Sequence, residues 1–245
     1  MRTILINAFG GPGAGKTTAC WEICSELKKS GILAEYVSEY AKELVYEMNN
    51  STFSEEAKRA AKLMDGSMDS QSIIFAEQKH RIDRIMGQVS VIVTDSPIIL
   101  SAVYCNNKTQ EFEDNLIRQF LDYDSFNFVI TRGNETFQHE GRMQNRAESI
   151  EKDKEITNML DKYGIPYEIY THETTTKLIA KIKELSRVFE NAYSEKDIVM
   201  LKDDYSGVIL RKHNASTLVN ALDKQKDAIA EEIEEMENEN EYFNE

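Results

Sequence analysis

Residues 10–17 read Gly-Gly-Pro-Gly-Ala-Gly-Lys-Thr and match the pattern G-x-x-x-x-G-K-[ST] without a gap. Glycines and small side chains let successive backbone N–H groups turn toward phosphate oxygens, and a helix that follows presents its positive end to the same anion. Lys16 would then reach the β- and γ-phosphates of ATP, and the hydroxyl of Thr17 would bind Mg²⁺. The residues expected to contact the nucleotide are Gly11, Gly13, Ala14, Gly15, Lys16, Thr17 and Thr18.

The segments on either side of this loop favour a phosphate-binding loop over a glycine-rich turn that matches by chance. Residues 3–9 form an apolar, β-prone run, and residues 18–29 are compatible with a helix. Strand, loop and helix therefore follow one another in the order that the motif requires. The pattern predicts nucleotide binding.

Two carboxylates follow strand-prone runs and are candidates for chemistry. Asp95 comes directly after the run at residues 90–94, where a P-loop protein places the carboxylate that holds Mg²⁺ directly or through water. The alternative for Asp95 is a helix N-cap ahead of Pro97. Glu39 follows the run at residues 33–38 and could accept a proton from an acceptor hydroxyl. Its alternative is a favourable acidic residue in a first helical turn, and which of the two carboxylates is the base stays open.

Three arginines lie in or beside a glycine-containing loop that follows the fourth strand-prone run. They are Arg132, Arg142 and Arg146, and Gly133 and Gly141 stand near the ends of the loop. Phosphoryl transfer develops charge on equatorial oxygens, which a cationic loop that closes over the site can neutralise. We expect the three arginines to serve catalysis in this way, against the alternative of a solvated charged loop.

Other polar and aromatic residues give weaker indications of function. Gln78 could read the edge of a base, although glutamine in a helix is more often only a good helix former. Trp21, Cys20 and Cys24 fall on the helix after the loop, where the apolar side chains should pack against the sheet. The four histidines have no metal-ligand spacing, so no zinc site is expected.

The elements that must position these residues alternate between strands and helices. This alternation predicts an α/β fold with three layers, α/β/α, a five-stranded parallel sheet and right-handed crossovers. Ligands of such sheets bind at the carboxyl ends of the strands, where the loop and both carboxylates lie. The β-prone runs are residues 3–9, 33–38, 90–94, 126–131 and 167–171.

Composition limits the classes of protein that the chain can belong to. It has 245 residues, 41% of them hydrophobic, and a net charge of −14 from 43 acidic and 29 basic residues. This charge disfavours a nucleic-acid partner, although a local basic pocket remains compatible with it. Three cysteines indicate a reducing compartment, and we expect a cytoplasmic protein. No run approaches the roughly 18 apolar residues of a membrane span, so no membrane partner is expected.

Several segments together resemble the P-loop kinase-type AAA ATPase domain of bacterial nicotinamide-riboside kinases and related phage-encoded proteins. They are residues 10–17, Glu39-Tyr40-Ala41-Lys42-Glu43, Gln78, Thr94-Asp95-Ser96-Pro97 and Gly141-Arg142-Met143-Gln144. The resemblance covers about residues 1–190 and implies a strand order of 2-3-1-4-5, an arginine-bearing lid and phosphoryl transfer to a small nucleoside-like acceptor. The Asp-Ser-Pro run is also similar to the Asp-Arg-Ser segment of deoxynucleoside kinases, whose arginine is absent here.

Two regions follow from this assignment. Residues 1–192 would form a P-loop kinase-like domain with a lid at about residues 132–147. Residues 193–245 would form a C-terminal β-hairpin outside the main sheet, with strands at 198–202 and 207–211, and then an acidic helical tail.

The leading functional hypothesis is an ATP- and Mg²⁺-dependent kinase of a nucleoside, nucleotide or related metabolite, with Thr17 and Asp95 on the metal. Two alternatives stay open: a kinase of a modified base in phage-type DNA, and a nucleotide-dependent regulatory ATPase or switch. The sequence leaves the acceptor and the oligomeric state undetermined.

Overall fold

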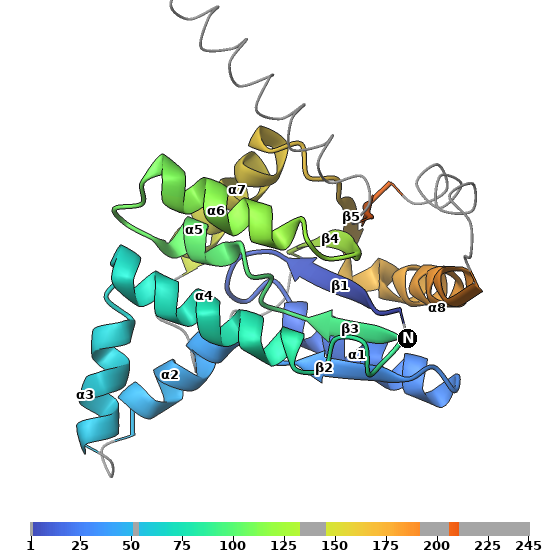
Figure 1. The fold of residues 1–245 in the computed structure, drawn as a ribbon, viewed down its shortest axis with the longest axis horizontal. Helices are drawn as coiled ribbons and strands as arrows, with labels where there is room; N and C mark the ends of the chain where they lie inside the picture. Colours follow the sequence, from blue (N-terminus) through green and yellow to red (C-terminus); the bar gives the residue numbers. More distant parts are fainter. Residues whose placement is uncertain (1, 51–53, 133–145, 192–205, 211–245) are drawn as a thin grey trace, which may run out of the picture.

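The computed structural model describes residues 2–50, 54–132, 146–191 and 206–210. Its centre is a parallel sheet in the order β2-β3-β1-β4-β5 (Figure 1), which confirms the expected α/β fold and strand order. The parallel strands are β1 (Ile4–Phe9), β2 (Ala34–Val37), β3 (Val91–Thr94), β4 (Ser125–Thr131) and β5 (Glu168–Thr171).

Helices cover both faces of the sheet (Figure 1). One face packs against α1 (Lys16–Lys29) and α8 (Thr175–Asn191), and a short 3₁₀ helix, His172–Thr174, precedes α8. The other face packs against four helices. They are α4 (Met68–Asp83), α5 (Leu100–Tyr104), α6 (Gln110–Phe120) and α7 (Arg146–Lys162).

The alternation of side chains along β1 explains why the sheet needs both layers. Ile4, Ile6 and Ala8 point toward α1 and α8, whereas Leu5 and Phe9 point toward the opposite helices. Every residue of β1 is buried, as expected of a central strand in a parallel sheet. The strand can therefore deliver its carboxyl end, and the loop that follows, to a fixed position.

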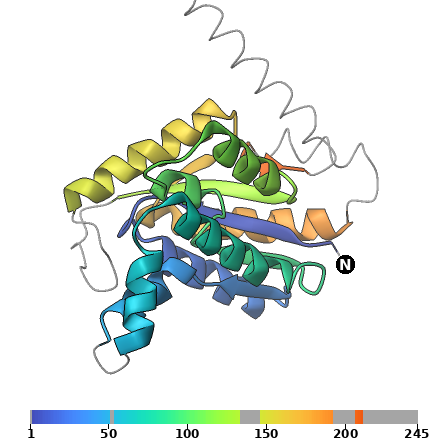
Figure 2. The same cartoon turned by 60° about the vertical axis from the view of Figure 1, so that its left-hand side comes forward.

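Two further helices form an arm at one end of the sheet (Figure 2). They are α2 (Tyr40–Met48) and α3 (Ser54–Leu63), which pack against α4 through a small separate core. Leu44 of α2, Ala60 and Leu63 of α3 and Ile74 of α4 form that core. The arm leaves the carboxyl end of β2 and so borders the same edge of the sheet as the P-loop, residues 10–17.

The C-terminal hairpin was expected to lie outside the main sheet, and this expectation is wrong for the half that the structure describes. The short strand β6 (Val208–Ile209) joins the sheet and pairs with β4 in antiparallel orientation. The reason lies in the register, because β5 pairs only with residues 128–131 of β4. The edge of β4 at Ser125 and Phe126 would be open without β6, which pairs with those two residues.

Asn127 of β4 stabilises this junction. Its side-chain Nδ2 donates to the carbonyls of Pro166 at 3.1 Å and Gly207 at 3.4 Å, and its Oδ1 accepts from Asn7 at 2.9 Å. The first strand of the predicted hairpin, the predicted boundary at residue 192 and the acidic helical tail lie outside the described residues. Among the helices that are described, none has the length and apolar character needed to cross a membrane.

Candidate active site at the P-loop

The P-loop leaves β1 and enters α1 through backbone conformations that favour glycine. Gly13 has φ 79° and Gly15 has φ 93°, both in the left-handed region, where a side chain would be strained. Gly15 is the N-cap of the 14-residue helix α1, and no side chain caps that end. The first N–H groups of the helix therefore remain open toward an anion, as the motif predicts.

Lys16 folds back across this loop. Its Nζ donates to the carbonyl oxygen of Gly10 at 2.6 Å and of Gly11 at 3.1 Å. These are neutral acceptors, which phosphate oxygens can replace with stronger charge-assisted bonds. Lys16 thus lies where a nucleotide's phosphates would meet it.

Thr17 and Asp95 meet beneath the loop. The Thr17 hydroxyl donates to Oδ2 of Asp95 at 2.6 Å, and Asp95 is only 1% exposed. The other carboxylate oxygen, Oδ1, is buried and has no hydrogen-bond partner in the described part of the chain. A buried carboxylate oxygen without a donor fits a divalent cation, or a water bound to one.

The donor set also fits the type of cation. No cluster of three or more His, Cys, Asp or Glu side chains occurs among the described residues. A hydroxyl and a carboxylate from the protein, completed by phosphate and water, suit Mg²⁺ rather than a cation that needs a cage of protein ligands. Thr17 and Asp95 are therefore the residues that could hold Mg²⁺.

Asp95 also sets the charge around the base of the P-loop. Burial, and then the negative charge of Asp95, raise the pKa of the Tyr36 hydroxyl far above its usual value. The same two causes raise the pKa of the Cys20 thiol. Both groups therefore stay neutral, and the negative charge beneath the loop belongs to Asp95.

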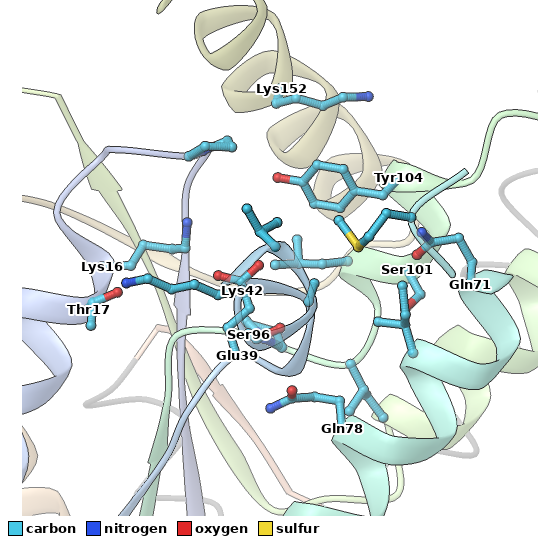
Figure 3. A pocket seen from close by; sticks show the side chains of 18 of the residues that line it. Lys16, Thr17, Glu39, Lys42, Gln71, Gln78, Ser96, Ser101, Tyr104 and Lys152 are labelled. Atoms are coloured by element: carbon cyan, nitrogen blue, oxygen red, sulfur yellow. The ribbon is translucent and has the colours of Figure 1, made fainter. Parts of the chain in front are cut away.

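A cavity of about 410 Å³ opens beside the P-loop and extends toward α2, α4 and α5 (Figure 3). Of the expected nucleotide contacts, Gly13, Gly15, Lys16, Thr17 and Thr18 line it. Ala14 is buried, and the Gly11 N–H is directed to a helix, as described below.

Glu39 lines the same cavity from the N-terminus of α2. Its backbone is extended, with φ −67° and ψ 118°, and it is the N-cap residue of that helix without a side-chain capping bond. In Figure 3, Glu39 lies between Lys16 of the P-loop and Gln78. The helix-terminus and functional interpretations of Glu39 are thus both compatible with its position.

Arg132 does not line the cavity but joins the P-loop to α7. Its Nε donates to Oδ2 of Asp153 at 2.5 Å, and a guanidinium nitrogen donates to the Ser149 carbonyl at 3.1 Å. Asp153 in turn accepts the Gly11 N–H at 2.5 Å through Oδ1. One carboxylate thus holds both the start of the P-loop and the arginine that follows β4.

This junction explains why residue 11 is glycine. A Cβ there would stand 2.4 Å from the Ser149 carbonyl oxygen and 2.9 Å from Oδ1 of Asp153. Of the other two expected lid arginines, Arg146 is the exposed first residue of α7. Arg142 lies outside the described residues, as do Gly133 and Gly141.

Two side chains differ from their sequence-based interpretation. The amide of Gln78 is buried, accepting from the Tyr40 N–H at 2.9 Å and donating to the Ser38 carbonyl at 3.2 Å. It holds the β2–α2 connection and is not directed at a base edge. Trp21 is 59% exposed instead of packed against the sheet, and it lines the rim of the cavity near Lys16.

Sequence reasoning missed several residues of the site. Lys42, Gln71, Ser101, Tyr104 and Lys152 all line the cavity. In Figure 3 the Lys42 side chain runs toward the P-loop, near Thr17. Lys42 entered the sequence analysis only as part of the segment at residues 39–43 that carries the family resemblance. Helical periodicity alone could not tell which neighbouring element each face of α2 meets.

Comparison with known proteins identifies the family. A family model described as "AAA domain" (AAA_28) matches residues 5–176. The chain belongs to this AAA domain family. The AAA domain match spans the P-loop, Glu39, Asp95 and Arg132, so a P-loop domain that binds nucleotide accounts for most of the chain.

Two other comparisons complement the AAA domain match. Among solved structures the chain is similar to one titled "Crystal structure of APE1195", with 16% identity and a TM-score of 0.36. That match covers 76% of this chain and 95% of the other. A search of curated proteins finds no significant match.

Proposed function

We propose that the protein is an ATP- and Mg²⁺-dependent phosphotransferase that acts on a small nucleoside, nucleotide or related metabolite. The observation that supports this most is the extent of the cavity. It begins at Lys16 and Thr17 and continues to Gln71 and Ser101, so it has room for a second reactant beyond the phosphates of a nucleotide. A site for hydrolysis alone needs only a water molecule there.

The donor half consists of the P-loop and the Thr17–Asp95 pair. Lys16 exchanges its carbonyl partners for the phosphates of ATP, and the N-terminus of α1 faces the same anion. When bound by Thr17 and Asp95, Mg²⁺ supplies charge neutralisation on the phosphates. These residues would direct the γ-phosphate toward the part of the cavity that extends to Gln71 and Ser101.

The acceptor half has Glu39 as its base. Asp95 is buried beneath Thr17, whereas Glu39 borders the cavity where an acceptor hydroxyl would approach. In this proposal Glu39 accepts the hydroxyl proton as the oxygen attacks the γ-phosphate, and ADP leaves. Asp95, together with Thr17, would hold the metal.

Arg132 has a supporting role in the proposed reaction. Its guanidinium is held by Asp153 beside the P-loop, at the end of β4. From this position Arg132 would help Asp153 to hold the start of the P-loop in place for the phosphates. Arg142 and Arg146 are proposed as further cations of the lid, which would neutralise charge on the transferred phosphoryl group.

The cytoplasmic location stays part of the proposal, supported by three free cysteines in the described chain.

A screen of ADP release tests the proposal. The protein is incubated with ATP and Mg²⁺, with and without nucleosides, nucleoside monophosphates, nicotinamide riboside and hydroxymethylated DNA, and Lys16→Ala serves as control. We expect steady ADP formation only with a particular small acceptor. Stimulation by the DNA alone would favour a kinase of a modified base, and equal release without any acceptor would favour a regulatory ATPase.

A further inference from the structure

Two largely buried polar side chains at the far end of the cavity have no hydrogen-bond partner among the described residues. Gln71 of α4 is 5% exposed and Ser101 of α5 is 6% exposed, and both line the cavity. Neither side chain makes a hydrogen bond to any other residue that the structure describes. Figure 3 shows the Gln71 amide and Ser101 at the end of the cavity away from Lys16.

Buried amides normally have hydrogen-bond partners. Gln78, two helical turns after Gln71 on α4, follows this rule. Gln78 satisfies its amide with two backbone groups, at 2.9 Å and 3.2 Å. The Gln71 amide instead faces the cavity and has no partner in the described part of the chain, so its hydrogen-bonding groups are available to a ligand. Gln71 offers that ligand one donor and one acceptor side by side.

The walls between these two side chains suit a flat ring. Val45, Ile74 and Leu100 are buried apolar residues that line the cavity, and Tyr104 adds an aromatic side chain. The Lys152 Nζ lies 5.5 Å from the centre of the Tyr104 ring and so fixes it on one side. Apolar and aromatic walls around a few polar groups are typical of sites for heterocyclic ligands.

The far wall is fixed by hydrogen bonds between two loops. The Asn106 N–H donates to the Gly66 carbonyl at 2.9 Å, and the Met68 N–H donates to Oδ1 of Asn107 at 3.0 Å. A Cβ on Gly66 would stand 2.4 Å from the Asn106 side chain, so the loops are in close contact. The cavity therefore has a defined end, close to Gln71.

We propose that Gln71 and Ser101 recognise the phosphoryl acceptor, and that the acceptor carries a flat ring with an amide-like edge. Such an edge has a hydrogen-bond donor next to an acceptor, as in a lactam or a carboxamide, and it pairs with the Gln71 amide through two bonds. The Ser101 hydroxyl binds a further polar group of the ring. The proposal rests on the phosphotransferase function and specifies the chemistry of its second substrate.

Paired ligands that differ only in this edge test the proposal. Calorimetric titrations use the full chain with Mg²⁺ and a non-hydrolysable ATP analogue. Inosine is compared with purine riboside, uridine with pyrimidin-2-one riboside, and nicotinamide riboside with N-ribosylpyridinium. Each pair is measured on the natural chain, on Gln71→Leu and Ser101→Ala, and on Ser72→Ala as a control on the exposed side of α4.

We expect at least one ligand with the amide-like edge to bind the natural chain about tenfold or more tightly than its partner. Gln71→Leu abolishes that preference, Ser101→Ala weakens binding of the same ligand, and Ser72→Ala changes neither. Unchanged thermal unfolding and unchanged affinity for the ATP analogue show that the variants are folded. A preference that survives Gln71→Leu overturns the proposal, as does the absence of binding by all six ligands.

Turnover with ATP separates this proposal from the function on which it rests. A ligand that binds through Gln71 but never stimulates ADP release contradicts the phosphotransferase and leaves the recognition site standing. An acceptor that is phosphorylated equally well by the natural chain and by Gln71→Leu contradicts the recognition site and leaves the phosphotransferase standing.

Discussion

The Thr17 hydroxyl lies 2.6 Å from Oδ2 of Asp95 and donates a hydrogen bond to it, which joins the first turn of α1 to the end of β3. The two residues are far apart in sequence, and parallel pairing of β1 with β3 brings their strand ends together. The remaining oxygen of Asp95 is buried without a donor among the described residues. A hydroxyl and a buried carboxylate with one open oxygen therefore meet directly below the P-loop.

Substitutions of Thr17 and Asp95 should act on Mg²⁺ dependence. Thr17→Val and Asp95→Asn should each lower turnover by about 100-fold or more and raise the Mg²⁺ concentration for half-maximal activity. Thr17→Ser keeps the hydroxyl and should retain most activity. Activity measured across a Mg²⁺ titration checks this, and a Thr17→Val variant with an unchanged titration curve would exclude Thr17 as a metal ligand.

Glu39→Gln tests which carboxylate is the base. The amide cannot accept the hydroxyl proton, so kcat with a good acceptor should fall by about 100-fold or more, while KM for ATP changes little. Glu47→Gln, an exposed position on the same helix, is the matched control and should leave both constants unchanged. Equal losses in kcat for Glu39→Gln and the control would argue that Glu39 only begins the helix.

Gly11→Ala tests the junction between the P-loop and α7. The new Cβ would meet the Ser149 carbonyl and would push Gly11 away from Asp153, so the free energy of unfolding should fall by about 2–5 kcal/mol. Gly31→Ala is a useful comparison, because its φ is +77° but nothing lies within 4 Å of the added Cβ. It should cost only about 1–2 kcal/mol.

Chemical denaturation without nucleotide measures both glycine variants, so effects on ATP binding do not enter. Similar losses for the two would show that Gly11 is not held closely against α7. A larger loss for Gly11→Ala, with a raised KM for ATP, is the expected result.

Glu113 provides a test by pH. Its carboxylate is 6% exposed and accepts hydrogen bonds from Lys162 at 2.8 Å and Lys108 at 3.1 Å. Burial raises the pKa of Glu113, but Lys162, Tyr163 and Lys108 together outweigh burial and hold the pKa below its usual 4.5. The stabilisation is therefore complete above the unfolded pKa and is lost as pH falls through the lower, folded value.

Glu113→Gln should consequently lower the free energy of unfolding at neutral pH by about 1–3 kcal/mol, and the melting temperature with it. The difference from the natural chain should shrink in acid. Glu111→Gln, on an exposed position of α6, is the control and should show little effect at either pH. Melting curves across this pH range decide the point. A difference that stays constant into acid would mean that the charge of Glu113 contributes nothing.

The fold could be predicted because the parallel strands are short β-prone runs that alternate with helical segments. Asp95 directly after β3 and Gly10 directly after β1 mark the ends of two such runs. The position of β6 could not be predicted, because it depends on the register of β5 against β4. Register is a property of strand pairs and leaves no mark within a single strand.

The site was predictable where it depends on strand ends and not where it depends on contacts between helices. Lys16, Thr17 and Asp95 follow β1 and β3, so the topology alone brings them together. Asp153 lies in the middle of α7, and Gln71 near the start of α4. Periodicity indicates which helical positions are buried, but whether the neighbour is the P-loop, a cavity or the core depends on how the helices pack.

The fate of the γ-phosphate tests the central claim most directly. The protein is supplied with Mg²⁺, γ-labelled ATP and an acceptor that stimulates ADP release, and the label is followed into products, with Lys16→Ala as control. We predict that the label appears in the phosphorylated acceptor, in amounts equal to the ADP formed. Label found only in inorganic phosphate, at a rate that no acceptor changes, would contradict the account.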